Sequence, residues 1–114
     1  KYTIELINNI KKYIMDDPKY KHVKIKWIEE HLPPDDYDGY KTVHEYVNNS
    51  LGISSLLLTC GEHEYTRWGF KQLLDGKCAD ILQPDISWMG GITEAKKLCS
   101  IASAYNIPVI PHGS

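Results

Sequence analysis

The chain has 114 residues, a length that accommodates one domain at most. Its 13 Lys and Arg residues against 15 Asp and Glu residues give a formal charge of −2, so it has neither the basic field that holds nucleic acid nor an acidic tail. Apolar residues make up 42% and charged residues 25% of the chain, which is typical of a globular segment and excludes a disordered one.

Neither a membrane segment nor a disulfide framework is indicated. The longest uncharged apolar stretch, residues 53–60, is far shorter than the ~20 residues that span a bilayer. The chain starts without an initiator Met and without signal-peptide architecture, so we expect a piece of a longer protein. Cys60, Cys78 and Cys99 form no CxxC pair. These features together favour a reducing, cytoplasmic setting.

Helical and strand patterns alternate along the chain. Apolar residues recur every four positions in residues 2–14, which predicts a helix that ends at Asp16-Asp17-Pro18. The next elements are predicted, in order, as a strand at 23–30, a helix at 40–47, a strand at 54–60, a helix at 65–74, a strand at 79–83, a helix at 92–105 and a strand at 107–111. This α/β alternation predicts a parallel sheet, and both a doubly wound sheet and a piece of a (β/α) barrel satisfy it.

A polar residue follows each predicted strand. Glu29, Glu62, Asp85 and His112 stand at these ends, separated by 33, 23 and 27 residues, each about one strand–helix unit. One strand-end acid is more often a solvated cap, but four successive polar ends indicate a shared site at the carboxyl rim of the sheet. Barrel enzymes keep their catalytic groups at this rim.

The residue types at these ends suit one kind of chemistry. Carboxylate oxygens without Cys or paired His ligands favour a hard cation such as Mg²⁺ over zinc. A His whose basicity and tautomer are set by an Asp can act as a general base. A metal on one side and a His base on the other can remove the proton α to a carboxylate, because the metal stabilises the negative charge that develops.

Six motifs carry a resemblance to a known family. They are Trp27-Ile28-Glu29-Glu30, Leu32-Pro33-Pro34-Asp35-Asp36-Tyr37, Gly61-Glu62-His63-Glu64-Tyr65-Thr66-Arg67, Ile81-Leu82-Gln83-Pro84-Asp85, Trp88-Met89-Gly90-Gly91 and Pro108-Val109-Ile110-Pro111-His112-Gly113-Ser114. Together they resemble the enolase superfamily, and within it the mandelate racemase-type acid-sugar dehydratases such as the L-rhamnonate dehydratases. The resemblance covers essentially the whole chain.

The resemblance implies a role for each strand-end residue. Glu29 matches the second metal ligand of the family and Glu62 the third. His112 matches the catalytic base and Asp85 the residue that hydrogen-bonds it. The four strands would then be the fourth to seventh of a (β/α)₈ barrel, about half of it. By the family's chemistry, His112 takes the α-proton of an aldonate, the 3-hydroxyl leaves as water, and a 2-keto-3-deoxy acid forms.

Three neighbouring residues have weaker signals. The resemblance makes His63 a candidate contact for a substrate oxygen, although a loop His without a function fits equally well. Trp88 is a candidate for lining the pocket, although packing near a turn is the more common role for an aromatic residue. Glu30 follows Glu29 and should face the other way, because alternate residues of a strand point to opposite sides.

The chain also departs from the family pattern. The family's first metal ligand is an Asp on the third barrel strand, and residues 1–114, which would begin on the helix after that strand, contain neither this Asp nor the N-terminal capping domain. We therefore expect residues 1–114 to be a partial barrel domain that is inactive alone, from a homo-oligomeric enzyme that acts on a small acid sugar and binds no nucleic acid or membrane. Two alternatives stay open: another racemase or dehydratase of the superfamily, and a non-catalytic truncated barrel that acts as an interaction module.

Overall fold

The computed structural model describes residues 1–113, in which parallel strands alternate with helices. Its elements are α1 (Tyr2–Ile10), β1 (Trp27–Glu29), α2 (Tyr37–Glu45), β2 (Leu57–Cys60), α3 (Thr66–Asp75), β3 (Ile81–Leu82) and α4 (Ile92–Ala104). A π-helical turn at Lys11–Met15 extends α1, and a 3₁₀ turn at Pro18–Tyr20 comes next along the chain. A second π-helical turn at Tyr46–Ser50 extends α2. The four predicted helices and the first three predicted strands are confirmed, with shorter strands than the sequence pattern indicated.

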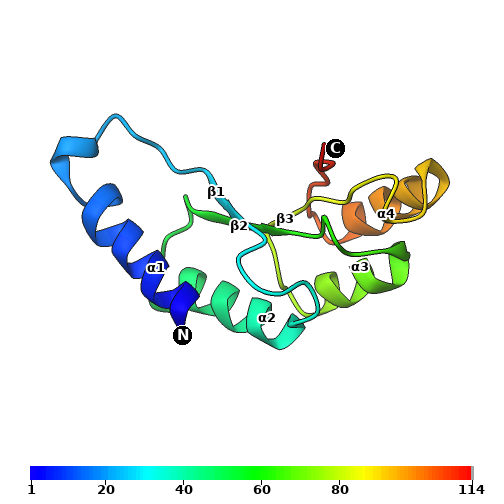
Figure 1. Ribbon diagram of the computed structural model, residues 1–114, viewed down its shortest axis with the longest axis horizontal. Helices are drawn as coiled ribbons and strands as arrows, with labels where there is room; N and C mark the ends of the chain where they lie inside the picture. Colours follow the sequence, from blue (N-terminus) through cyan, green and yellow to red (C-terminus); the bar gives the residue numbers. More distant parts are fainter. Residues whose placement is uncertain (114) are drawn as a thin grey trace.

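The strands form one parallel sheet in the order β1-β2-β3. Glu29 lies opposite Thr59, and Cys60 lies opposite Leu82. Helices α1, α2 and α3 lie on one side of the strands (Figure 1). The predicted fold class, an α/β arrangement of parallel units consistent with part of a (β/α)₈ barrel, is confirmed.

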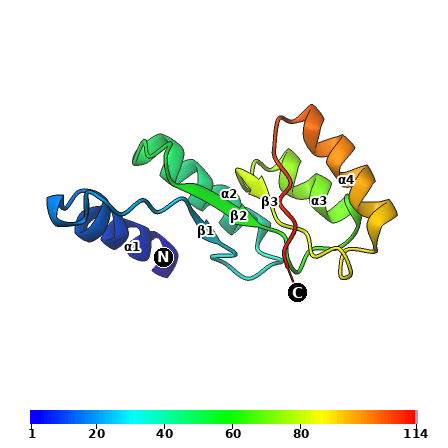
Figure 2. The same cartoon turned by 90° about the horizontal axis from the view of Figure 1, so that it is seen from above.

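The predicted strand at 107–111 is wrong as a regular strand, because this segment makes only isolated parallel bridges, Leu82 with Val109 and Asp85 with His112. Its backbone hydrogen bonds still alternate along the chain: the Leu82 amide donates to Pro108, the Ile110 amide to Leu82 and the His112 amide to Pro84. The missing rung is the one that residue 84 would donate, and Pro84 has no N–H. The segment nevertheless runs beside β3 (Figure 2).

Two clusters of apolar side chains form the core. One surrounds Phe70 of α3 and includes Leu98 of α4, and α3 and α4 lie side by side (Figure 2). The other joins α1 to β2 through Ile7, Val47 and Leu58. Phe70 and Leu58 are completely buried, which fixes α3 and β2, the elements that flank the Glu62 loop. No helix within residues 1–113 combines the length and apolar character needed to cross a membrane.

Candidate active site

The four strand-end residues converge at the carboxyl edge of the sheet. Glu29 is the last residue of β1, Glu62 follows the end of β2, and Asp85 pairs with His112 in a parallel bridge beyond β3. One ligand atom each from Glu29, Glu62 and His112 lies within 4.8 Å of the others. Parallel strands direct their carboxyl ends to the same edge, which is why residues so far apart in the sequence meet here.

The backbone before Glu62 requires glycine. Gly61 has a φ of 121°, in the region that side-chain-bearing residues rarely adopt. A Cβ at Gly61 would also lie 2.7 Å from a ring carbon of Phe70. The Gly61 carbonyl then accepts the Glu64 amide at 3.1 Å, which closes the turn. The buried ring and the turn together aim Glu62 across the strand edge.

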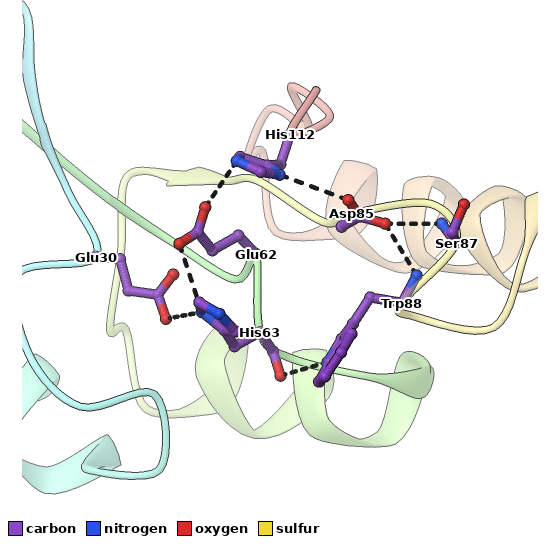
Figure 3. A network of polar contacts seen from close by, with 7 residues as sticks. All are labelled: Glu30, Glu62, His63, Asp85, Ser87, Trp88 and His112. Carbon is purple, nitrogen blue, oxygen red and sulfur yellow. Dashed lines mark hydrogen bonds and ion pairs between the residues drawn. The ribbon is translucent and has the colours of Figure 1, made fainter. Parts of the chain in front are cut away.

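His112 lies between two carboxylates (Figure 3). Its Nε2 is 2.8 Å from Oε2 of Glu62, and its Nδ1 is 3.5 Å from Oδ2 of Asp85. The other Asp85 oxygen accepts the backbone amides of Ser87 and Trp88, each at 2.9 Å. The Trp88 amide is the largest influence that lowers the pKa of Asp85, and the neighbouring His112 imidazole and the Ser87 amide add to it. Asp85 is therefore an ionised, oriented neighbour of the imidazole.

His63 occupies the opposite side of Glu62 (Figure 3). Its Nδ1 lies 2.7 Å from Oε1 of Glu30 and 3.4 Å from Oε1 of Glu62. The Trp88 indole donates to the His63 carbonyl at 3.0 Å, and the two rings meet edge to face at 6.0 Å. The hydrogen bond with Glu30 raises the pKa of His63. His63 and Trp88 thus border the same small hollow as Glu62, Asp85 and His112.

Glu30 borders the candidate site through His63, a contact that the sequence pattern did not indicate. Its backbone adopts a φ of 34° where the chain leaves β1, and a carboxylate oxygen of Glu30, like one of Glu29, lies within 4.8 Å of Glu62. Its side chain is only 11% exposed and faces His63. Burial raises the pKa of Glu30 above the ordinary value, although the hydrogen bond with His63 opposes the change. The sequence feature that could have indicated this contact is the pair of adjacent glutamates, Glu29 and Glu30, at the end of a strand.

Two overlapping sets of residues have the spacing of metal ligands. One consists of Glu29, Glu62 and His112, and the other of Glu30, Glu62 and His63. Glu29 is exposed, and its carboxylate accepts the Trp27 indole N–H at 3.3 Å, which leaves oxygen lone pairs open toward Glu62. Two carboxylates at this rim fit Mg²⁺, which prefers oxygen ligands and takes one or two carboxylates from the protein.

A larger hollow lies at the opposite end of the sheet. It has a volume of about 390 Å³ and is lined by Leu74, Ile107 and the hydrogen-bonded pair His44–Asp80. The hollow beside His112 measures about 200 Å³. The hollow beside His112 is lined by all the strand-end side chains except Glu29. We therefore choose it as the candidate site for the residues that line it, although it is the smaller of the two hollows.

The chain belongs to the enolase C-terminal domain-like family, whose model matches residues 17–114. It is similar to the solved structure of 3,6-anhydro-D-galactonate cycloisomerase from Zobellia galactanivorans, with 38% identity and a TM-score of 0.76 over 98% of this chain and 27% of that one. It is also similar to L-rhamnonate dehydratase from Gibberella zeae, with 40% identity and a TM-score of 0.75 over 99% of this chain and 25% of that one.

A second structure of the Gibberella zeae rhamnonate dehydratase, complexed with Mg, matches at 38% identity with a TM-score of 0.74 over 98% of this chain and 24% of that one. The resemblance to the enolase superfamily and its acid-sugar dehydratases is thereby confirmed. The chain spans about a quarter of the length of these structures.

Proposed function

We propose that this chain is the part of an Mg²⁺-dependent hydro-lyase that carries the base and two metal ligands, and that the whole enzyme dehydrates an acid sugar similar to L-rhamnonate. The observation that carries the proposal is the position of His112, 2.8 Å from Glu62 and 3.5 Å from Asp85. A base beside a metal ligand and an oriented carboxylate is what α-proton removal requires. The Mg-complexed rhamnonate dehydratase supports the choice of metal.

The reaction begins with a proton transfer to His112. Glu29 and Glu62 would hold the cation, which, when bound, supplies positive charge beside the substrate carboxylate. His112 takes the α-proton, and the C–H electron pair moves into an enediolate. Asp85 keeps the imidazole oriented and stabilises its protonated form.

The second stage expels water. The enediolate electrons form the C2–C3 double bond as the C3–O bond breaks, and the leaving hydroxide takes the proton from His112. The resulting enol tautomerises to the 2-keto-3-deoxy acid, so the overall loss is one water. His63 and Trp88 border the same hollow as His112, and we propose that they contact substrate oxygens.

The similarity to 3,6-anhydro-D-galactonate cycloisomerase favours a second candidate. An anhydro acid carries an ether oxygen at C3 in place of a hydroxyl. The same α-proton removal by His112 would then break a C–O bond of the ring, and the product would keep the mass of the substrate.

Mass spectrometry of the products tests the proposal. The full-length protein from its source should be incubated with L-rhamnonate, other aldonates and a 3,6-anhydro aldonate, with Mg²⁺ or with EDTA. We expect an aldonate to lose the mass of one water only in the Mg²⁺ arm. Conversion of the anhydro acid alone, without mass loss, would favour the second candidate. An inert aldonate panel, or equal turnover with EDTA, would contradict the proposal.

A further inference from the structure

Glu64 is a buried carboxylate that the proposed reaction does not use. Glu64 belongs to neither of the two sets of residues that have the spacing of metal ligands, and it is only 8% exposed. It follows Glu62 by two positions in the loop after β2. A buried carboxylate is costly unless its oxygens accept hydrogen bonds, so its partners indicate its role.

Both Glu64 oxygens accept hydrogen bonds. Oε2 accepts the hydroxyl of Tyr37 at 2.5 Å, and Oε1 accepts the backbone amide of Tyr65 at 3.0 Å. The carboxylate also lies directly against Gly69 of α3, where any Cβ would overlap it. Helix α3 therefore has a glycine where the carboxylate needs the space.

Tyr37 lies at the end of the loop that follows Glu29. It is the first residue of α2, which follows directly after the loop that leads away from Glu29. The Tyr40 hydroxyl holds that loop to α2 by donating to the Leu32 carbonyl at 2.7 Å. The Tyr37–Glu64 bond thus joins the loop after β1 to the loop after β2. Burial and the neighbouring Glu64 raise the pKa of Tyr37, so its hydroxyl stays a donor.

We propose that the Tyr37–Glu64 hydrogen bond positions the metal ligands, holding the two loops so that Glu29 and Glu62 keep the separation that a divalent cation needs. The inference rests on the proposed function, in which these two carboxylates bind the metal. Parallel pairing fixes the strands, but Glu62 lies beyond the last paired residue of β2. Outside the sheet, the Glu30–His63 contact and the Tyr37–Glu64 bond are hydrogen bonds between side chains that join the segment after β1 to the loop after β2.

Mn²⁺ binding to the full-length protein tests this positioning role without any turnover. The loss of the EPR signal of free Mn²⁺ measures the binding. Tyr37→Phe removes the hydroxyl and keeps the ring. We expect its Kd for Mn²⁺ to rise about tenfold, the lower range for residues that orient metal ligands. Tyr105→Phe is the matched control, because Tyr105 donates to Asp75 at the same 2.5 Å distance far from the site. Its Kd should change less than about twofold.

Two further variants separate positioning from general loss of structure. Glu64→Gln keeps an oxygen that can accept the Tyr37 hydroxyl, so its Kd should fall between those of the wild type and Tyr37→Phe. The double variant should bind no more weakly than Tyr37→Phe alone, because both changes act on one bond. Circular dichroism at the assay temperature should show all variants folded.

The outcomes distinguish this inference from the proposed function. A wild-type protein that binds no Mn²⁺ would overturn both. Wild-type binding that Tyr37→Phe leaves unchanged, or weakens no more than Tyr105→Phe, would overturn the positioning role alone. Effects of Tyr37→Phe and Glu64→Gln that multiply in the double variant would also overturn it.

Discussion

The imidazole of His112 reaches across β3 to Glu62, with Nε2 only 2.8 Å from the carboxylate oxygen. Glu62 follows β2 and His112 follows the segment on the far side of β3. The contact requires both side chains to lean along the same edge of the sheet. The proposed base and a proposed metal ligand are therefore next to each other, and one substrate carboxylate can lie within reach of both.

Adjacent glutamates allow a direct test of which set of residues binds the metal. Glu29 is exposed and belongs to the set with His112, whereas Glu30 is engaged by His63. We expect Glu29→Gln to weaken Mg²⁺ binding by more than about 100-fold and Glu30→Gln by only about tenfold, because Glu30 acts only through its neighbours. Isothermal titration calorimetry measures both.

Each of these variants controls for the other, since both remove one negative charge from neighbouring positions. The reverse order of effects would assign the metal to Glu30, Glu62 and His63 instead.

Asp80 makes stability depend on pH at the opposite end of the sheet. Burial alone would raise its pKa, but hydrogen bonds from His44 at 2.9 Å and from the Leu58 amide at 2.8 Å outweigh burial and lower it. The folded pKa thus lies below the unfolded value of about 3.9. The contribution of Asp80 is fully present above that value and is lost as the pH falls through the folded pKa.

The variant Asp80→Asn should therefore be less stable than the wild type by about 1–2 kcal/mol at pH 7. The difference should shrink as the pH is lowered below about 4, where the carboxyl is protonated first in the unfolded state and then, at still lower pH, in the folded protein. Urea unfolding at several pH values measures this. A difference that is constant down to pH ~2 would show that the charge of Asp80 has no part in it.

Phe70 supports the Glu62 loop through packing. Its ring is completely buried and lies against Gly61. Phe70→Ala should lower the free energy of unfolding by about 3–5 kcal/mol, because it leaves a cavity in the core.

Trp68→Ala is the control on the same helix. Trp68 is 64% exposed and contacts the Arg67 guanidinium. Its loss should cost less than about 1 kcal/mol. Equal losses for the two variants in chemical denaturation would contradict the description of this core.

The sequence predicted the alternation of elements well, because helix and strand periodicities are local. It also predicted that the strand-end side chains come together, since the carboxyl ends of parallel strands meet at one edge of the sheet. The prediction of a regular strand at 107–111 was wrong because Pro84 on the neighbouring segment has no N–H to donate. That effect can be foreseen only when the pairing register is known.

Contacts between loops could not be predicted from the sequence pattern. Strand alternation predicted that Glu30 would face away from Glu29, but nothing local indicated that it would meet His63. The Tyr37–Glu64 bond likewise depends on how α2 sits against α3. Such contacts follow from three-dimensional packing rather than from periodicity.

Deuterium exchange at the α-carbon tests the central claim, that His112 is the base. The full-length protein is incubated in D₂O with Mg²⁺ and the aldonate it converts, and ¹H NMR follows the α-proton of recovered substrate together with product. We expect His112→Asn to lower both exchange and turnover about 10²–10⁴-fold, the usual contribution of a general base. The exposed His22→Asn should leave both rates unchanged. Wild-type rates in His112→Asn would contradict the account.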